Sequence, residues 1–435
     1  MTLNRVWRAA MVAGVVCAAG LAASAAAAAS TTVAWGTTTS APAGTRAGLF
    51  GVAAASSSDV LGVGGYNPGE SPTALLTRPY AEHWNGSGWS ATTVPLAPVY
   101  SGGQAAQLNG VAEVAAGDGW AVGTVADPSS FASQTLSYHW NGGTWQRVPT
   151  PDPAGPSQGN ELAAVAARAT NDVWAAGGAG PYPAASLVLH WNGSTWAQVR
   201  VPSIGALDAV TVTPASVWVA GGNKVEQFNG SAWTSLPALP GDVSIDGLAD
   251  TAAGLWAVGY ESYSTYTGGT ITVSYAALWN GSAWTTVPVG GGGLSGVVAA
   301  GSEVLATSQA EVWQLTPTAS TQQIVPQNLG PLSAIAADPA GNPWAVGGLS
   351  IINEPGIGQG GIQVDTGAAN ATLTWTGPVN GSGTTGYDGK FATGGLPDGT
   401  YTITASLSGC QPGVTTATVT AGQVTPVTAK IACPP

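Results

Sequence analysis

The sequence predicts an all-β chain in which one four-stranded unit is repeated and a different β module follows. Two motifs, Trp-Asn-Gly-x-x-Trp and a partner typified by residues 172–178, recur at intervals of tens of residues. Beyond about residue 350 the repeat ends, and short segments of alternating polar and apolar residues follow. The first motif begins at Trp84, Trp140, Trp191, Phe228 and Trp279, and the second at Asp59, Asp118, Asp172, Ser216 and Gly254. Units of this length cannot bury their own apolar faces, so they must stack on copies of themselves.

Residues 1–29 have the pattern of a secretory signal peptide. Arg5 and Arg8 precede an apolar stretch at 9–21, and a run of small residues follows at 22–29. A membrane anchor is the alternative, but about 13 apolar residues are fewer than the roughly 20 needed to span a bilayer. Lipidation at Cys17 is disfavoured because Val16 before it is not small. We therefore expect a secreted protein, extracellular or associated with the cell surface, without membrane insertion.

Charge restricts the partners of the chain. It has 22 acidic and 10 basic residues, a net charge of −12, and only 7% charged residues. Signal cleavage would remove two basic residues and no acidic ones, which leaves a net charge of −14. An acidic surface repels nucleic acid and anionic lipid, so neither is expected as a partner. We expect a monomer.

The third copy of the repeat shows the elements of one unit. Strands are predicted at 162–167, 173–176, 187–191 and 196–199, with Asn-Gly at 192–193 forming the tight turn before the last. The two Trp residues of each hairpin should lie on one face and fill the space between neighbouring units. A Trp ladder that binds sugar is the alternative, but recurrence at equivalent positions favours packing.

Seven units can be counted from their first strands. These begin near Leu49, Leu108, Leu162, Leu207, Ile245, Leu294 and Leu332. The seventh unit has no Trp-Asn-Gly hairpin, whereas residues 32–38 resemble the fourth strand at 284–287. We infer that this N-terminal strand completes the last unit and closes a ring without open edges. The predicted fold over residues 30–350 is a seven-bladed β-propeller.

With these motifs, the chain resembles the secreted bacterial β-propellers of the Kelch and galactose-oxidase-like type. The resemblance covers about residues 31–350 and implies the architecture rather than an activity. The Kelch double-glycine signature is present in part, at residues 64–65, 177–178, 221–222 and 347–348.

The C-terminal part reads as a separate module. Residues 351–361 contain a Gly-rich stretch and are predicted to be a linker. In residues 362–435, a hairpin at 387–391 and the Leu-Pro-Asp-Gly-Thr-Tyr sequence at 396–401 resemble carboxypeptidase regulatory-like, prealbumin-like domains. The resemblance implies a small β-sandwich that acts as a non-catalytic spacer or attachment module. Cys410 and Cys433 remain after signal cleavage, and in an oxidising compartment they are expected to form a disulfide, with free buried thiols as the alternative.

No catalytic, metal or cofactor site is predicted. His83, His139 and His190 occupy the same repeat position in three different units, so they should be separated and structural rather than gathered at a metal. A glycosidase carboxylate pair stays open as an alternative because Glu70 and Glu261 have no assigned role.

The connections that vary in length indicate the binding face. They join second to third strands and fourth to first strands, and in a propeller both classes lie at the same face. Tyrosines gather in or beside them, and exposed Tyr suits recognition of glycans or proteins, although the loops could instead cover their own apolar surface. The predicted ligand-binding residues are Tyr66, Tyr80, Tyr182, Tyr260, Tyr263 and Tyr266. The sequence thus favours a secreted, non-enzymatic protein that binds an extracellular glycan or protein; the alternatives are a polysaccharide hydrolase or lyase and a purely structural surface protein.

Overall fold

The computed structural model describes residues 35–37, 46–67, 77–96, 105–130, 132–264, 269–326, 329–348, 350–353, 359–420 and 423–434. These residues form strands, turns and irregular segments with no helix, so the all-β prediction is confirmed. No helix among them is therefore of a length and apolarity that would cross a membrane. The predicted signal peptide at 1–29 lies outside the described ranges.

Seven four-stranded antiparallel sheets, here numbered 1 to 7 in chain order, make up the larger part of the described structure. Sheet 1 contains β2 (Arg46–Ser56), β3 (Asp59–Asn67), β4 (Arg78–Trp84) and β5 (Trp89–Thr92); sheet 2 contains β6 (Ala105–Ala115), β7 (Asp118–Ala126), β8 (Ser133–Trp140) and β9 (Trp145–Arg147). Sheet 3 contains β10 (Asn160–Ala169), β11 (Asp172–Ala179), β12 (Ala185–Trp191) and β13 (Trp196–Val199); sheet 4 contains β14 (Ala209–Val212), β15 (Val217–Gly221), β16 (Lys224–Phe228) and β17 (Trp233–Ser235). Sheet 5 contains β18 (Val243–Thr251), β19 (Gly254–Ser264), β20 (Thr270–Trp279) and β21 (Trp284–Val287); sheet 6 contains β22 (Gly296–Ala300), β23 (Glu303–Ser308), β24 (Glu311–Thr316) and β25 (Ala319–Gln322). Sheet 7 contains β26 (Ala334–Ala337), β27 (Pro343–Gly347), β28 (Ser350–Asn353) and β1 (Gly36–Thr37).

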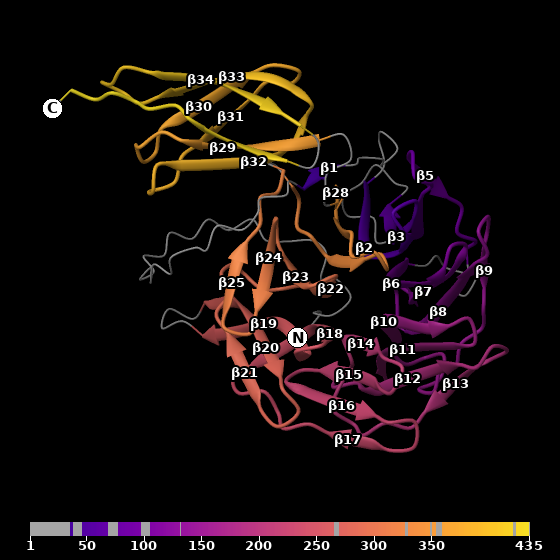
Figure 1. The fold of residues 1–435 in the computed structure, drawn as a ribbon. Helices are drawn as coiled ribbons and strands as arrows, with labels where there is room; N and C mark the ends of the chain where they lie inside the picture. Colours follow the sequence, from indigo (N-terminus) through magenta and orange to yellow (C-terminus); the bar gives the residue numbers. More distant parts are fainter. Residues whose placement is uncertain are drawn as a thin grey trace.

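The seven sheets stand around a common centre (Figure 1). Their first strands contact one another in cyclic order, β2 to β6, β10, β14, β18, β22 and β26, and β26 contacts β2 again. Adjacent first strands come close at one repeated position: a β-carbon added to Gly51 would lie 3.1 Å from the Cα of Gly110, and one added to Gly110 would lie 3.3 Å from the Cα of Ala164. The small residues of the first strands are therefore needed where neighbouring backbones approach.

The N-terminal segment contributes the outer strand of sheet 7. β1 pairs antiparallel with β28 through Gly36↔Asn353 and Thr37↔Ile352, and the Trp35 side chain is fully buried. The sheet order β1-β28-β27-β26 joins the two ends of the repeated region. Residues 351–353, predicted as part of a linker, instead belong to β28, where Ile351 and Ile352 are buried. The sequence did not reveal this strand because sheet 7 lacks the Asn-Gly turn that follows the third strand in sheets 1 to 5.

Tryptophans of the hairpins pack between sheets. Trp84 and Trp89 lie directly opposite each other on β4 and β5, and equivalent pairs recur in sheets 2 to 5. The ring centroids of Trp84 and Trp344 are 5.8 Å apart between sheets 1 and 7. Those of Trp120 and Trp191 are 4.7 Å apart between sheets 2 and 3. The predicted packing role of these residues is thus confirmed.

Two further sheets form the C-terminal module. One contains β31 (Gly381–Thr384), β30 (Thr372–Thr376), β33 (Gly399–Ser406) and β34 (Gly413–Val419); the other contains β32 (Lys390–Pro397), β29 (Gln359–Asp365) and β35 (Val424–Thr428). Residues of both sheets share one apolar core that includes Val364, Trp375 and Tyr401. The predicted disulfide between Cys410 and Cys433 is present, with the two Cα atoms 4.2 Å apart. β29 begins at Gln359, so residues 359–361 of the predicted linker lie in a strand.

Candidate functional site

The two ends of the ring differ in how their strands are connected. One end carries the tight turns that follow Trp-Asn, such as residues 85–88, where the side-chain oxygen of Asn85 accepts hydrogen bonds from the backbone N–H groups of Ser87 and Gly88. The other end, here called the variable face, carries the connections between second and third strands and those between sheets. Variation in these connections is what distinguishes one unit from the next, so the variable face is where a specific site is to be sought.

A projecting hairpin is the most distinctive feature of the variable face. In sheets 4 and 6 the second and third strands form five residue pairs, ending at Gly221↔Lys224 and Ser308↔Glu311. In sheet 5, which stands between them, β19 and β20 form ten pairs, of which the fifth is Gly259↔Tyr275. The five additional pairs, here called the arm, run from Tyr260↔Ser274 to Ser264↔Thr270. At about 3.4 Å per residue, the arm extends roughly 17 Å beyond the hairpins of both neighbours.

The side of the arm that faces sheet 4 carries exposed apolar side chains. Below the arm, Tyr275 and residues on the same face of β19 share a core with sheet 4. Because side chains alternate along a strand, this face continues toward the tip of the arm through Glu261, Tyr263, Ile271 and Val273. Tyr263 is 49% exposed and Ile271 is 47% exposed. No hairpin of sheet 4 reaches high enough to cover them, so an aromatic ring and an aliphatic chain lie open above sheet 4.

The opposite side of the arm is covered by its own chain at the base, whereas Thr272 on this side is exposed. Tyr260, Ser262 and Thr272 lie on this side, and the glycine-rich connection 290–293 passes against it. A β-carbon added to Gly293 would lie 3.3 Å from the Cβ of Tyr260 and 3.6 Å from the Cγ2 of Thr272. The two sides of the arm are thus unequal: one is hydroxyl-rich and covered at its base, and the other is partly apolar and open.

Glu261 is the acidic group at the base of the open side. A hydrogen bond to Glu261 raises the pKa of the Tyr263 hydroxyl, with burial and the negative charge as smaller causes. Burial raises the pKa of Tyr275 to about 12, and the charge of Glu261 adds to this. Tyr275 is only 7% exposed, and its buried hydroxyl has no hydrogen-bond partner among the described residues. Both hydroxyl groups are therefore neutral at physiological pH, and Tyr263 presents a ring with a hydroxyl rather than an anion.

Sheet 3 borders sheet 4 on its other side and contributes a second exposed aromatic residue. Tyr182 lies in the connection between β11 and β12 and is 76% exposed. A cavity of about 330 Å³ lies at the outer edge of sheet 3, lined by Ser186, Gln198, Val199, Arg200 and Val201. The hydroxyl of Ser186 donates to the carbonyl of Gly205 in the connection that leads into sheet 4. The short sheet 4 is thus flanked by exposed tyrosines on both sides.

The structure separates the six predicted tyrosines into different environments. Tyr182 and Tyr263 are exposed, whereas Tyr260 is half-buried on the covered side of the arm. Tyr80 is not a surface residue: it is 7% exposed within β4, and its hydroxyl donates to the buried carboxylate of Glu82. Burial and this interaction raise the pKa of Tyr80 well above its ordinary value. Tyr66 packs edge-on against Tyr80 with ring centroids 5.9 Å apart, and Tyr266 lies outside the described residues.

Sequence reasoning missed Ile271 and the strand that carries it. The sequence predicts that Tyr260 and Tyr263 lie in or beside a connection of variable length, whereas in the structure both belong to the long strand β19. The alternation of Ile271, Val273 and Tyr275 with Thr and Ser is nevertheless a strand signal that was present in the sequence.

The three histidines each pair with an aspartate in a separate sheet. The Nε2 atoms of His83, His139 and His190 lie 2.6, 2.8 and 3.0 Å from the Oδ1 atoms of Asp59, Asp118 and Asp172. His190 also stacks on Trp174, with ring centroids 4.3 Å apart. Among the described residues, no group of three or more His, Cys, Asp or Glu side chains is placed to hold a metal ion. These pairs fix the turns at the end opposite the variable face.

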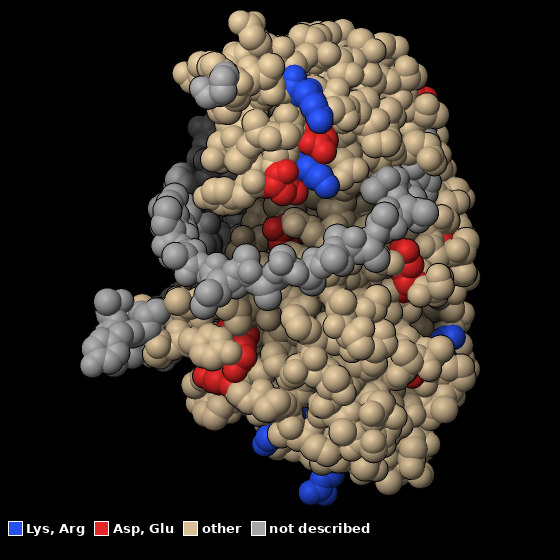
Figure 2. Space-filling view, turned by 60° about the vertical axis from the view of Figure 1, so that its left-hand side comes forward, with Lys and Arg blue, Asp and Glu red and all other residues tan. Residues whose placement is uncertain are grey.

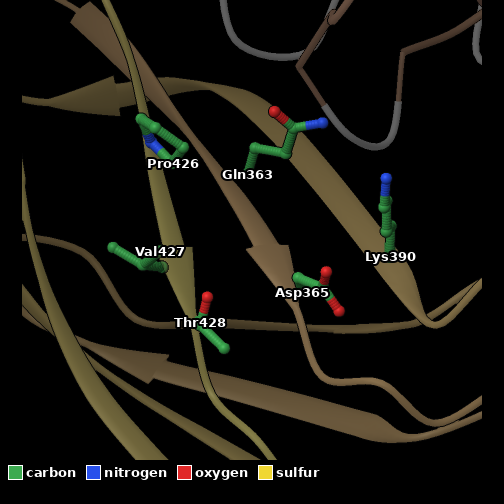
Figure 3. Close-up of a pocket in the computed structure, with 6 residues that line it drawn as sticks. All are labelled: Gln363, Asp365, Lys390, Pro426, Val427 and Thr428. Atoms are coloured by element: carbon green, nitrogen blue, oxygen red, sulfur yellow. The ribbon is translucent and has the colours of Figure 1, made fainter.

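The C-terminal module has a small cavity of its own. It has a volume of about 230 Å³ and is lined by Gln363, Asp365, Lys390, Pro426, Val427 and Thr428 (Figure 3). Gln363 and Asp365 project from β29, Lys390 comes from the neighbouring β32, and the other three residues come from β35. An open depression on one face of a three-stranded sheet lacks the enclosed apolar walls of most small-molecule sites. We therefore place the candidate site at the arm.

Charged side chains are sparse on the surface. Figure 2 shows a mainly uncharged face: basic and acidic groups lie side by side near its top, and the other charged groups are scattered over wide uncharged areas. This agrees with the 7% of charged residues in the chain. Recognition at such a surface depends on shape, aromatic contact and hydrogen bonds rather than on a strong electrostatic field.

Comparison with known proteins identifies the fold but no family. The chain matches no family model, and no curated protein is significantly similar to it. Similar solved structures include streptogramin B lyase, with 13% identity, coverage of 73% of this chain and 96% of that chain, and a TM-score of 0.50. They also include YCF48 bound to a D1 peptide (13% identity, 73% and 94% coverage, TM-score 0.48) and the WD40 β-propeller domain of Doa1 (9% identity, 73% and 96% coverage, TM-score 0.48). The ring of four-stranded sheets and the likeness of its fold to that of streptogramin B lyase define the chain as a β-propeller protein, as the repeats predicted.

Proposed function

We propose that this protein is a secreted, non-enzymatic recognition protein whose variable face binds an extracellular glycan or protein. The observation that carries the proposal is the arm of sheet 5, which holds Tyr263 and Ile271 open to solvent above the shorter sheet 4. An aromatic ring beside an aliphatic side chain, both on a paired strand, offers contact area at a small cost in conformational entropy.

Two features favour binding over simple coverage of an apolar interior. A protruding two-stranded ribbon is only marginally stable by itself, so a purely structural role would favour a short turn, as in sheets 4 and 6. In addition, the apolar residues of the arm point to its uncovered side, whereas the glycine-rich connection 290–293 lies on the other side. An extended ligand lying above sheet 4 would contact the arm on one side and the Tyr182 connection on the other.

The proposal includes the finer assignments made from the sequence. Sheets 1 to 7 are the seven blades of one propeller of the Kelch-like type, and the two C-terminal sheets form a carboxypeptidase regulatory-like sandwich. The Cys410–Cys433 disulfide supports an oxidising, extracellular location. The protein acts as a monomer, without a cofactor and without nucleic acid or membrane insertion.

The proposal can be tested with an array of extracellular polysaccharides and surface-protein peptides probed with the full secreted chain. Tyr263→Ala combined with Ile271→Ser should weaken binding to the strongest hit by about tenfold or more, because exposed aromatic anchors of this kind contribute about 1–2 kcal/mol each. A matched control is Ser262→Ala combined with Thr272→Ala, on the side of the arm that faces away from sheet 4, which should leave affinity unchanged.

Four outcomes would contradict the proposal in different ways. Equal loss of binding in both double variants would show that binding depends on the folded arm as a whole and not specifically on the side chains of Tyr263 and Ile271. Binding unaffected by either variant would place the ligand elsewhere. Degradation of a polysaccharide on the array by the unaltered protein would favour the hydrolase or lyase alternative, and no binding at all would favour a structural surface protein.

A further inference from the structure

The strand that closes the ring is in contact with the C-terminal module. Besides β28, β1 contacts β32 and β29 of that module. The module lies beside sheet 7 and the N-terminal strand in the overall view (Figure 1). The closing strand is thus bordered by the blade that it completes and by a domain that the sequence analysis treated as a spacer.

Three segments distant in sequence meet at this point. The backbone N–H of Trp35 donates to the carbonyl of Ile324, at an N···O distance of 3.4 Å. The N–H of Gly394, in β32, donates to the carbonyl of the next residue, Val325, at 3.3 Å. Pro326 and Gly394 also form a parallel β-bridge. The connection between sheets 6 and 7 is therefore held by the N-terminal segment and by the C-terminal module.

A local irregularity in β32 makes Gly394 available for this contact. The register of β32 with β29 shifts between Leu396↔Gly360 and Thr393↔Ile362, so two residues of β32 face one residue of β29. Gly395, at the shift, has a φ of 73° that suits glycine. A bulge of this kind turns a backbone group out of its own ladder. The N–H of Gly394 is directed to the propeller instead.

The fit at Gly394 is close. A β-carbon added there would lie 2.5 Å from the carbonyl oxygen of Trp35 and 3.6 Å from that of Ile324. Trp35 itself is fully buried in a core formed with residues of sheets 6 and 7. Only a residue without a side chain allows β32 to come this near to the closing segment.

From these contacts we propose that the C-terminal module is a clasp on the ring: its bulged strand β32 holds the N-terminal closing strand in place. The seam of the propeller, defined as residues 35–37 together with β28, then depends on the folded module for part of its stability. The module is not an independent spacer. Its docking restrains the point at which the ring would open first, since within the described residues β1 forms two residue pairs with β28.

Hydrogen exchange of the full secreted chain tests the clasp. Gly394→Ala should speed exchange of the seam amides by about tenfold or more, because local opening no longer has to break the contact with β32. Gly330→Ala is the control: it makes the same chemical change in the connection between sheets 6 and 7 that β32 contacts, but an added β-carbon there has no atom within 4 Å. Unchanged exchange at the seam in Gly394→Ala would overturn the proposal.

A second variant separates loss of the clasp from direct displacement of Trp35. Tyr401 is fully buried in the core of the module, so Tyr401→Ala loosens the module without adding any atom near the seam. The clasp predicts faster exchange at the seam as well as in β33. Faster exchange in β33 with an unchanged seam would show that the ring closes independently of the module and would refute the proposal.

Discussion

Replacing Glu113 should change how the stability of the propeller depends on pH. Glu113 belongs to β6 of sheet 2, but one of its carboxylate oxygens accepts a hydrogen bond from the backbone N–H of Ala55 in sheet 1, at 3.1 Å. The other oxygen is buried, and no described residue lies at hydrogen-bond distance and geometry to it. Burial raises the pKa of Glu113 from 4.5 to about 9, and the nearby charge of Asp59 adds to the shift, whereas backbone hydrogen bonds oppose it.

The direction in which stability changes with pH follows from the raised pKa of Glu113. Below about pH 4.5 Glu113 is protonated in both folded and unfolded chains, and it has no destabilising effect. As pH rises from 4.5 toward 9, the unfolded chain loses the proton while the folded chain retains it, so the free energy of unfolding falls. At 1.36 kcal/mol per pH unit, the loss between pH 4.5 and 7 is at most about 3 kcal/mol.

Glu113→Gln removes the titrating group while keeping the shape and an acceptor for the Ala55 N–H. Urea unfolding of wild type and variant at pH 4.5 and pH 7 gives the comparison. A constant offset caused by the new amide cancels, because only the change between the two pH values is used. The stability of the variant relative to wild type should rise by about 1–3 kcal/mol from pH 4.5 to 7. Glu303→Gln, at an exposed carboxylate, should show no such rise.

Parallel pH profiles for wild type and Glu113→Gln would refute the reasoning. They would mean that water or a structural adjustment solvates the buried carboxylate, so that its ionisation carries no cost in the folded chain.

Further predictions concern the seam, the disulfide and the sheet packing. Deleting residues 30–40 should lower the melting temperature by many degrees, since it removes β1 and the fully buried Trp35, a loss of about 3–5 kcal/mol by analogy with large-to-small core changes; an unchanged melting temperature would contradict this. Intact-mass spectrometry of the secreted protein should show two hydrogens fewer than the reduced form, and both Cys410 and Cys433 should resist thiol labelling until reductant is added. Trp344→Ala should destabilise the fold by about 3–5 kcal/mol because this buried ring packs on both Trp84 and Trp89 of the adjoining sheet, and a change below about 1 kcal/mol would argue against inter-sheet packing as its role.

The repeated part of the fold was predictable because each repeat contains turn residues and tryptophans that mark the ends of its strands. The Asn-Gly turns at positions such as 192–193 and the Trp residues that flank them fix where third strands end and fourth strands begin. The orphan strand near Trp35 could be assigned because it resembles the fourth strand of other units. In sheet 7 the Asn-Gly turn is absent, and the prediction of the third strand failed there. Residues 351–353 of β28 were assigned to the linker although Ile351 and Ile352 are buried within sheet 7.

The candidate site was predictable only in outline. Tyrosine enrichment drew attention to the segment around residue 263, but composition does not reveal which tyrosines face outward. Tyr80 has the same residue type as Tyr263, yet a neighbouring carboxylate on Glu82 and a place between sheets bury it. The distance by which the arm extends beyond its neighbours follows from the number of residue pairs between second and third strands in sheets 4, 5 and 6. This pairing is known only once the sheets have formed.

The contact of the module with the ring could not be predicted from its sequence either. The Gly394–Gly395 pair indicates a special backbone position, but nothing near it in sequence points to Trp35 or Val325 as the partner. Only the assembled topology brings these segments together.

The most direct test of recognition at the arm is a hydrogen-exchange footprint of the strongest-binding molecule from the array. The account predicts that bound ligand slows exchange at 259–275, in the turn of sheet 4 at 221–224 and in the Tyr182 connection, and leaves the Asn-Gly turns at the opposite end unchanged. Protection confined to those Asn-Gly turns or to the C-terminal module, with the arm unaffected, would contradict it.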